Sequence, residues 1–456
     1  MLVLPLGITW FLAAILALLD GRRSWVGLLG VAGLAAAFAV TVWLTTVVLQ
    51  VGRLEMTAGG WPAGIGITLR LDALGALFAV TSLVVLLAAL GCEVLSGVRA
   101  RAFPALVLFL ATGLNGLFLT GDAFNFYVFF EVSMIASFVL TGYGERSREM
   151  RATMIFVMVN LLGSVLFLAG TVALYHVTGT LDMVGISEQI GSVRPSTVIL
   201  IASMILVAFA VKLGLFPFHF WLPAVYRDTR PVVAAILSGA VANIGGYGLL
   251  RFGGELLPSA LEVGATALLV LGAASIVYGE LLAISRYPTS EVLAYSSIGQ
   301  VGYILIALAV GGELGYGAAI LYAVANSLNK TLLFLATGLL GGTVGAAFAV
   351  GAFSVAGVPP SVGFFGKVAV FQAGIADGSA AIVCLVFVGA ALSFVYMFQI
   401  YQRNFWRGRA PRSSSPLSAR LLILGLAGLV VALGIWPEPL LAAGRQAATG
   451  LAGQPR

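Results

Sequence analysis

Three lysines are present among the 456 residues, and each lies inside a stretch apolar enough to span a membrane. They are Lys212 in ILVAFAVKLGLFPFHFWLP, Lys330 in ANSLNKTLLFLATG and Lys367 in GVPPSVGFFGKVAVFQAG. A lysine at the bilayer centre costs roughly 2.5–3.5 kcal/mol on the translocon scale. Unlike arginine, a desolvated lysine can release its proton near neutral pH. Lysines confined to such positions therefore indicate sites that carry protons or ions.

Glu131 is a candidate partner for the first of these lysines. It lies in FNFYVFFEVSMIASFVL, with no other charged residue between Asp122 and Glu145. A nearby ammonium group stabilises the charged form of a buried carboxylate. We therefore expect Glu131 and Lys212 to form a pair that moves a proton when it opens and closes. The alternative is a static ion pair that only fixes helix packing.

Other polar residues fall in the same apolar stretches. His219 follows Pro217 and either shuttles protons or caps the local loop. The stretch EVLAYSSIGQVGYIL offers hydroxyl and amide groups that either carry a file of water or hold helices together. These groups belong to Tyr295, Ser296, Ser297, Gln300 and Tyr303. By contrast, we expect Glu262 and Glu280 to lie towards the two ends of their span and to face lipid headgroups.

The composition indicates an all-α polytopic membrane protein. Hydrophobic residues make up 60% of the chain and charged residues 9%, whereas soluble domains carry about 25% charged residues. The net charge of +6 therefore reports orientation in the membrane, not nucleic-acid binding. Two widely separated cysteines and two histidines lack the spacing of a haem, iron–sulfur or metal site. We expect neither a cofactor nor a bound metal.

The elements that must position these residues are about 14 transmembrane helices. Apolar windows of about 20 residues lie near 3–19, 25–50, 71–91, 102–120, 124–143, 153–177, 197–226, 231–252, 258–284, 293–311, 316–340, 343–375, 379–402 and 419–437. Arginines fall mostly in alternate connections, which are cytoplasmic under the positive-inside rule if the N-terminus lies outside. We therefore expect a multi-pass protein of a prokaryotic inner membrane with an external N-terminus.

Prolines interrupt two of these spans. Pro217 breaks the seventh span, and Pro359 and Pro360 break the twelfth, since proline removes a backbone donor. Broken helices at membrane depth are tolerated where they line a cavity or are buried in protein. Five spans separate the two breaks, so they would have opposite orientations, as in inverted repeats with ion sites near the breaks. An ordinary proline kink is the alternative.

The repeats divide the chain into four parts. Residues 1–100 hold spans 1–3, and residues 101–252 form the first inverted repeat of spans 4–8. Residues 253–405 form the second inverted repeat of spans 9–13. Residues 406–456 hold the fourteenth helix and a tail.

Five of these segments resemble the antiporter-like family of proton-translocating membrane subunits. The family includes the large subunits of Mrp-type Na⁺/H⁺ antiporters and the antiporter-like subunits of complex I and membrane-bound hydrogenases. The resemblance covers roughly residues 70–405, and its motifs are FNFYVFFEVSMIASFVL, VKLGLFPFHFWLPAVY, LAYSSIGQVGYIL, NSLNKTLLFLATG and GVPPSVGFFGKV. It implies 14 helices, two inverted five-helix repeats and a central polar axis. It also implies that Glu131 pairs with Lys212, that Lys330 is the central relay and that Lys367 is the terminal site.

The sequence departs from the family pattern at the centre of this axis. Asn243, in AILSGAVANIGGYGLLR, stands where relatives usually carry a titratable residue on the eighth span. An amide relays a hydrogen bond but cannot hold a proton at neutral pH. Ser296 and Ser297 stand where many relatives carry a histidine. The axis is therefore expected to contain fewer titratable groups than usual.

The resemblance implies a proton-translocating subunit of a multisubunit monovalent cation (Na⁺)/H⁺ antiporter, with other membrane subunits as partners. Tyr226, which closes HFWLPAVY, favours this hypothesis. The alternative is a proton-pumping subunit of a complex I-type NADH–quinone oxidoreductase or a membrane-bound hydrogenase. Neither hypothesis gives the chain a redox or hydrolytic site of its own. A permease for an organic substrate is disfavoured by the charged axis, and a structural subunit without transport stays open because of Asn243.

Overall fold

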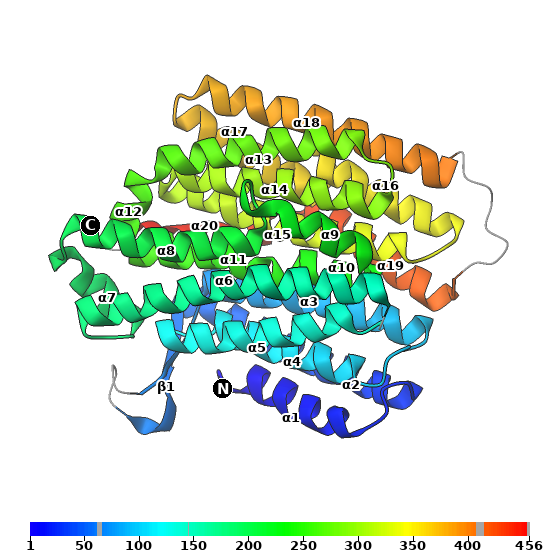
Figure 1. Cartoon of the computed structure of the whole chain (residues 1–456), viewed down its shortest axis with the longest axis horizontal. Coiled ribbons are helices and arrows are strands. Elements are labelled where there is room, and N and C mark those ends of the chain that lie inside the picture. The colour runs from blue at the N-terminus through cyan, green and yellow to red at the C-terminus, as the bar shows by residue number, and fades with distance from the viewer. Residues whose placement is uncertain (62–65, 145, 407–414, 454–456) are drawn as a thin grey trace.

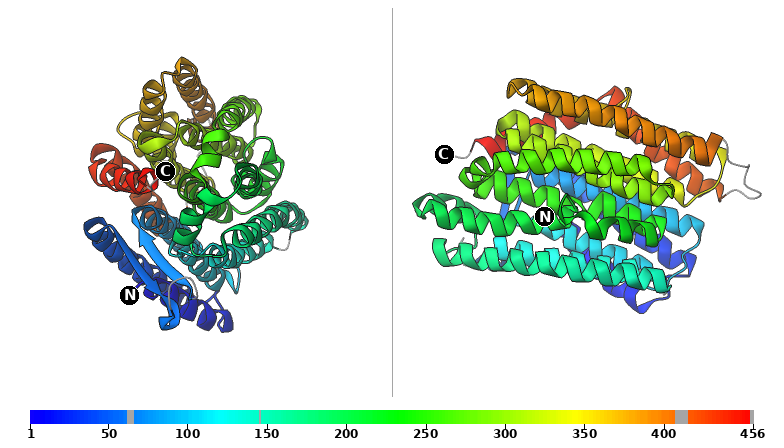
Figure 2. Two further views of the ribbon diagram at one scale, coloured as in Figure 1. Left: turned by 90° about the vertical axis from the view of Figure 1, so that its left-hand side faces the viewer. Right: turned by 45° about the horizontal axis from the view of Figure 1, so that its top comes forward.

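The computed structural model describes residues 1–61, 66–144, 146–406 and 415–453, and almost all of them are helical (Figure 1). The long helices run side by side along one direction, and the end-on view in Figure 2 shows them as one bundle. Apolar segments adopt this arrangement because each helix satisfies its own backbone hydrogen bonds without water.

Within the described residues the helices form fourteen spans, which confirms the predicted number. Eleven are long and apolar enough to cross a membrane unaided; α1, α4 and the interrupted span α16–α17 consist of shorter apolar helices. The uninterrupted spans are α1 (Leu4–Leu18), α2 (Ser24–Val51), α3 (Ala73–Ser96), α4 (Phe103–Phe118), α5 (Ala123–Gly142), α6 (Ser147–Thr178), α13 (Ala265–Ser285), α14 (Thr289–Val310), α15 (Gly312–Thr337), α18 (Ala380–Tyr401) with η6 (Gln402–Trp406), and α19 (Leu417–Ile435).

Three spans contain interruptions or wider turns. The seventh consists of α8 (Pro195–Leu213), η3 (Phe218–Phe220) and α9 (Trp221–Asp228), and the twelfth of α16 (Gly342–Ala356) and α17 (Val362–Ala376). The eighth runs through α10 (Pro231–Ile236), the π-helical turn η4 (Leu237–Val241), α11 (Asn243–Gly248) and the π-helical segment η5 (Leu249–Leu256).

The two ends of the bundle differ in structure. One end, here called the strand end, carries the antiparallel pair β1 (Arg53–Thr57) and β2 (Thr68–Asp72), with Arg53 opposite Asp72. It also holds η1 (Ala58–Gly60), α7 (Met183–Gln189), η2 (Ile190–Ser192) and α12 (Pro258–Val263). The other, here called the arginine-rich end, holds the connections with Arg22, Arg99, Arg146 and Arg227.

Helix α15 forms the centre of the bundle. Its most apolar 18-residue window is buried throughout, whereas about two-thirds of the corresponding windows in α18 and α19 are not buried. The outer helices expose large apolar side chains such as Trp10, Phe11 and Ile135, as a lipid-facing surface requires. The polar residues in the middle of α15, Ser327, Asn329, Lys330 and Thr331, are therefore buried away from both lipid and bulk water.

The chain ends in a helix that the sequence does not predict. Helix α20 (Glu438–Ala452) follows α19 after a break at Trp436 and Pro437 and packs against α15 and α3. Gly444 lies beside Leu321, and Thr449 Oγ1 donates to Glu313 at 3.1 Å. The segment predicted as a tail after the fourteenth span thus contains an ordered helix over most of its length.

Candidate functional site

The seventh and twelfth spans are interrupted by the same local backbone arrangement. Helix α8 ends at the left-handed Gly214, and helix α16 ends at the left-handed Gly357. Glycine adopts this backbone conformation without the steric penalty of a side chain. A cis-proline follows three residues after each glycine, at Pro217 and Pro360. Each helix therefore ends at its glycine, ahead of the predicted prolines, and Lys212 lies two residues before the first glycine.

Lys212 occupies the last turn of α8 and is 5% exposed. Its Nζ lies 4.2 Å from the centre of the Phe130 ring and makes no hydrogen bond to any atom of the residues that the structure describes. An ammonium over an aromatic face is stabilised by the ring quadrupole. The amine of Lys212 thus contacts the ring of Phe130 and not the carboxylate of the neighbouring Glu131.

Glu131 lies close to Lys212 without contacting it directly. Its carboxylate accepts a hydrogen bond from Ser164 of α6 and interacts electrostatically with Lys212 across a gap too long for an ion pair. Consecutive helical residues face different directions, so α5 cannot direct both Phe130 and Glu131 at the amine. The two charges are neighbours, and a side-chain movement would be needed to close the pair.

Lys330 is fully buried in α15 and faces α14. Its Nζ donates to Ser296 Oγ at 2.6 Å and to the Leu293 carbonyl oxygen at 3.3 Å. No carboxylate lies within ion-pair distance of this amine among the residues that the structure describes. Because both acceptors of Lys330 are neutral, the amine can lose its proton without leaving a carboxylate that lacks an ion-pair partner.

Asn243 lies between α3 and α15, directly after the π-helical turn η4. Its Nδ2 donates to Ser82 Oγ at 3.1 Å, and its Oδ1 accepts from Ser327 Oγ at 2.6 Å. Ser327 precedes Lys330 by three residues, so both lie on one face of α15. Single π-helical turns are frequent at functional sites because they shift the register of side chains. The amide is therefore hydrogen-bonded within the polar centre of the bundle.

Lys367, on α17, is 5% exposed and lies beside the second break. Its Nζ donates to Ser393 Oγ at 3.4 Å and to the carbonyl oxygen of Ala356 at 3.5 Å. The same nitrogen lies 5.1 Å from the centre of the Tyr303 ring. The carbonyl is available because α16 ends at Ala356, so the helix break supplies one of the contacts of the lysine.

Glu280 lies in the interior, and the prediction that it faces headgroups is wrong. It is fully buried on α13; Oε1 accepts from Gln300 Nε2 at 2.8 Å, and Oε2 accepts from Ser393 Oγ at 3.0 Å. Helices α13 and α14 approach closely through glycines, among them Gly279 and Gly299. Small residues at a helix interface permit this approach. The carboxylate is thus directed into the bundle beside both Lys330 and Lys367.

A sequence signal for Glu280 exists in the facing helix. Ser296 and Gln300 lie four residues apart on α14, so they form a polar stripe on one face of an apolar span. A buried polar stripe requires polar partners, and a carboxylate on the adjacent span is a suitable one. The sequences of the two spans together therefore indicate the contact.

Two of the predicted supporting residues have other contacts. Ser297 Oγ donates to the Leu293 carbonyl oxygen at 2.9 Å, within its own helix. His219 packs between Phe216 and Tyr278, with ring-centre separations of 5.5 and 4.4 Å. Neither residue has a hydrogen bond to a buried lysine among the described contacts.

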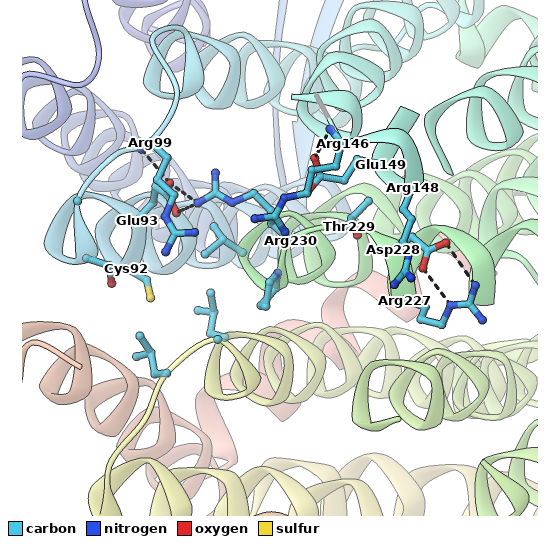
Figure 3. A pocket seen from close by; sticks show the side chains of 17 residues that line it. Cys92, Glu93, Arg99, Arg146, Arg148, Glu149, Arg227, Asp228, Thr229 and Arg230 are labelled. Atoms are coloured by element: carbon cyan, nitrogen blue, oxygen red, sulfur yellow. Dashed lines mark hydrogen bonds and ion pairs between the residues drawn. The ribbon is translucent and has the colours of Figure 1, made fainter. Parts of the chain in front are cut away.

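A cavity of about 380 Å³ opens at the arginine-rich end (Figure 3). Five arginines and three carboxylates line it, and Arg230 Nη2 contacts both oxygens of Glu93 at 2.6 and 2.8 Å. Leu335 also lines it, five residues beyond Lys330 on α15, which is about 7.5 Å along a helix axis. The charged lining residues are Glu93, Arg99, Arg146, Arg148, Glu149, Arg227, Asp228 and Arg230. The cavity thus brings an aqueous face to within about two helical turns of the central lysine.

An ion cluster of two arginines and two carboxylates lies at the strand end. Arg251 contacts Asp72 at 2.7 Å and also pairs with Glu255, while Arg70 contacts Glu255 at 2.6 Å and Asp72 at 3.0 Å. Burial alone would raise the pKa of the Asp72 carboxyl, but Arg251 and Arg70 outweigh it and hold that pKa well below its usual range. Asp72 also caps α3 by accepting from Gly75 N at 2.9 Å. The cluster ties the hairpin, α3 and the eighth span together.

The sequence of this bundle has close counterparts among known membrane subunits. Residues 120–345 match the family described as NADH:quinone oxidoreductase/Mrp antiporter. A Na⁺/H⁺ antiporter subunit of Alkalihalophilus pseudofirmus is 30% identical, over 96% of this chain and 94% of the relative. The chain belongs to this family. The predicted resemblance is therefore confirmed.

Solved structures of the NADH:quinone oxidoreductase/Mrp antiporter family have the same fold. A chain of the Mrp complex from a Dietzia species superposes with a TM-score of 0.92 at 26% identity, covering 99% of this chain and 97% of that one. A chain of respiratory complex I from Thermus thermophilus superposes with a TM-score of 0.86 at 23% identity, covering both chains fully. The relatives are thus subunits of multisubunit membrane assemblies.

Proposed function

We propose that this chain is the proton-translocating subunit of a multisubunit Na⁺/H⁺ antiporter. The observation that carries the proposal is the set of buried ionisable side chains in the helical spans, Lys212, Glu280, Lys330 and Lys367, with the half-buried Glu131 beside the first of them. Buried charges are expensive in a membrane and are retained where they carry ions or protons. The name of the A. pseudofirmus relative supports sodium as the exchanged cation.

In the proposed mechanism each residue has one task. Lys212 and Glu131 form the first proton-binding pair, and closing the gap between them favours the charged forms of both. Asn243 passes hydrogen bonds towards α15 through Ser327 but holds no proton. Lys330 is the central relay.

Lys367 is the terminal site, beside the second break. Residues 101–252 and 253–405 act as two inverted repeats, each with its lysine near a break. These assignments are supported by the matching glycine and proline positions at the two breaks.

We also propose an orientation in the cell membrane, with the N-terminus outside and the arginine-rich end in the cytoplasm. The excess of arginine in the connections at that end supports it through the positive-inside rule. The cavity beside Glu93 and Arg230 then faces the cytoplasm. In this orientation it offers protons a short route towards Lys330.

A second candidate function is a proton-pumping subunit of a redox-driven complex. The fold match to T. thermophilus complex I favours it, and the same buried axis would serve. The partner subunits distinguish the two functions. Purification in mild detergent is expected to recover small antiporter subunits, and recovery of quinone-reducing or hydrogenase subunits would favour the second function.

The proposal is tested in vesicles that hold the assembled complex. We expect Lys212→Ala and Glu131→Ala each to abolish Na⁺-dependent proton movement, because each removes one member of the first pair. Glu262→Ala is the matched control, since Glu262 is an exposed carboxylate on the short helix α12. Wild-type transport in both pair variants would refute the relay, and loss of transport in the control would show that the assay lacks specificity.

A further inference from the structure

Lys330 begins a series of direct hydrogen bonds between side chains. Its Nζ donates to Ser296 Oγ at 2.6 Å, and that hydroxyl shares a hydrogen bond of 2.8 Å with Tyr396 Oη of α18. Lys330, Ser296 and Tyr396 are all fully buried. A hydroxyl group can accept one proton while it releases another. A proton can therefore pass along this segment, and each hydroxyl group has one proton again afterwards.

The series continues from Tyr396 to Lys367 through a carboxylate. The Tyr396 hydroxyl is hydrogen-bonded to Glu280, whose Oε2 accepts from Ser393 Oγ at 3.0 Å. Ser393 in turn accepts from Lys367 Nζ at 3.4 Å. Two amines that belong to helices α15 and α17 are thus joined through side chains of α13, α14 and α18.

The carboxylate is held in place by a group that cannot carry the proton itself. Gln300 Nε2 donates to Glu280 Oε1 at 2.8 Å, and Gln300 Oε1 accepts from Tyr322 at 2.5 Å. An amide does not titrate at neutral pH. Gln300 therefore positions Glu280 between the two lysines and leaves its second oxygen to the hydroxyl groups.

We propose that Glu280 is a proton-binding residue that transfers protons between Lys330 and Lys367. The inference rests on the proposed transport function and adds a site to it. Three hydroxyl groups connect the site to the lysines, those of Ser296, Tyr396 and Ser393.

The transfer balances without any further reactant. The Lys330 ammonium gives a proton to Ser296 while the Ser296 proton passes to Tyr396 and the Tyr396 proton passes to Glu280. The products are a neutral amine and a neutral carboxylic acid. Glu280 then gives its proton to Ser393, whose own proton passes to a neutral Lys367. One proton has moved from Lys330 to Lys367, and Glu280 is again a carboxylate.

The last link is the weakest of the series. A separation of 3.4 Å between Lys367 and Ser393 exceeds the usual range for a strong hydrogen bond. Ser393 must also rotate its hydroxyl hydrogen from Glu280 towards Lys367 before the second transfer. This step therefore depends on a side-chain movement beside the break at Gly357.

A purely electrostatic role of Glu280 is the competing explanation. Lys367 and Lys330 both face the carboxylate, as do the phenols of Tyr396, Tyr303 and Tyr322. A fixed negative charge would stabilise both ammonium groups and would need no hydroxyl group between them. Removing an uncharged hydroxyl group from the series separates the two explanations.

Tyr396→Phe and Tyr303→Phe form a matched pair for this test. Both tyrosines are fully buried in the same cluster, but Tyr303 Oη has no hydrogen-bond partner among the described residues. In vesicles with the assembled complex we expect Tyr396→Phe to lower Na⁺-dependent proton movement about a hundredfold or more, since a positioned proton-transfer group typically contributes about 10²–10⁴-fold. We expect Tyr303→Phe to retain it, because the variant keeps the aromatic ring that faces Lys367 and loses only the hydroxyl group without a partner among the described residues.

Infrared difference spectroscopy of the purified assembled complex gives a readout that does not depend on transport. We expect a carboxylic-acid band that changes with pH in the wild type and is absent in Glu280→Gln. It should shift in Tyr396→Phe, which loses a hydrogen bond to the carboxyl group, and stay in place in Tyr303→Phe.

The outcomes separate this inference from the proposed function. Equal transport in Tyr396→Phe and Tyr303→Phe would overturn the transfer route. Absence of a Glu280 band at every pH at which the complex stays folded would overturn proton binding at this site. If the wild type moves no protons with Na⁺, the proposed function fails, and the infrared band still decides whether Glu280 takes up and releases a proton.

Discussion

Replacement of Lys330 by methionine should abolish transport without weakening the fold. The amine is fully buried, and its contacts are Ser296 at 2.6 Å and the Leu293 carbonyl at 3.3 Å. Methionine keeps an unbranched side chain of similar length and removes the charge. Ser296 keeps its hydrogen bond to Tyr396 in the variant, so no buried hydroxyl group is left unpaired.

The magnitude follows from two opposing terms. Removing a lysine from the membrane interior recovers roughly 2.5–3.5 kcal/mol. The lost hydrogen bond to Ser296 is worth about 1.5–3 kcal/mol, since the donor is charged. The carbonyl contact is near the long limit for a hydrogen bond and adds little. The terms largely cancel, and we expect the free energy of unfolding to change by no more than about 2 kcal/mol.

The assay combines the thermal unfolding midpoint in mild detergent with Na⁺-dependent proton movement in vesicles. Leu328→Met is the control, since Leu328 is buried two residues earlier on the same helix. A destabilisation of about 3 kcal/mol or more, the size expected when a buried ion pair is broken, would make Lys330 a structural residue. Transport equal to that of the Leu328→Met control would remove Lys330 from the path.

Three further predictions concern the ion cluster and the central amide. Arg251→Met should lower the free energy of unfolding by about 3–5 kcal/mol, because it breaks buried ion pairs. The control Arg445→Met removes a residue of an exposed ion pair and should change the free energy of unfolding by less than about 1 kcal/mol. Similar unfolding midpoints for the two variants would contradict this prediction. The pKa of Asp72 is depressed in the folded chain, so its stabilisation should be full above the unfolded-state pKa of about 3.9 and fall as the pH drops below it. The unfolding midpoints of the wild type and Asp72→Asn should therefore converge in acid, and a constant difference would disprove the assignment. Asn243→Lys should preserve or raise Na⁺-dependent proton movement, because Ser327 keeps a second acceptor in the Ala323 carbonyl; loss of movement would make the amide itself a required part of the path.

The spans were predictable from the sequence because each apolar window is long enough to form a helix by itself in a membrane. Helix α20 was not, since Glu438 and Arg445 interrupt its apolar residues and its order depends on packing against α15. The pair β1–β2 also escaped prediction. Its strands, RLEMT and TLRLD, do alternate polar and apolar residues, but each has only five residues, and the ion cluster around Asp72 holds them.

The lysines of the site were predictable because a charge in an apolar span is visible without any structure. The groups that join them were not. Tyr396 and Ser393 lie about 100 residues from Ser296 and Glu280, and neither tyrosine nor serine is unusual in a transmembrane helix. The sequence places Glu280 towards one end of its span, but it does not show that the close approach of α13 and α14 turns the side chain inwards.

The central claim is that buried lysines move protons by releasing them, and Lys212→Arg tests it most directly. Arginine keeps the positive charge beside Glu131 but does not deprotonate in proteins. The measurement is proton movement driven by an imposed Na⁺ gradient in vesicles, with co-purification of the partner subunits as the check on assembly. We predict an assembled complex that no longer moves protons, and wild-type proton movement in this variant would contradict the claim.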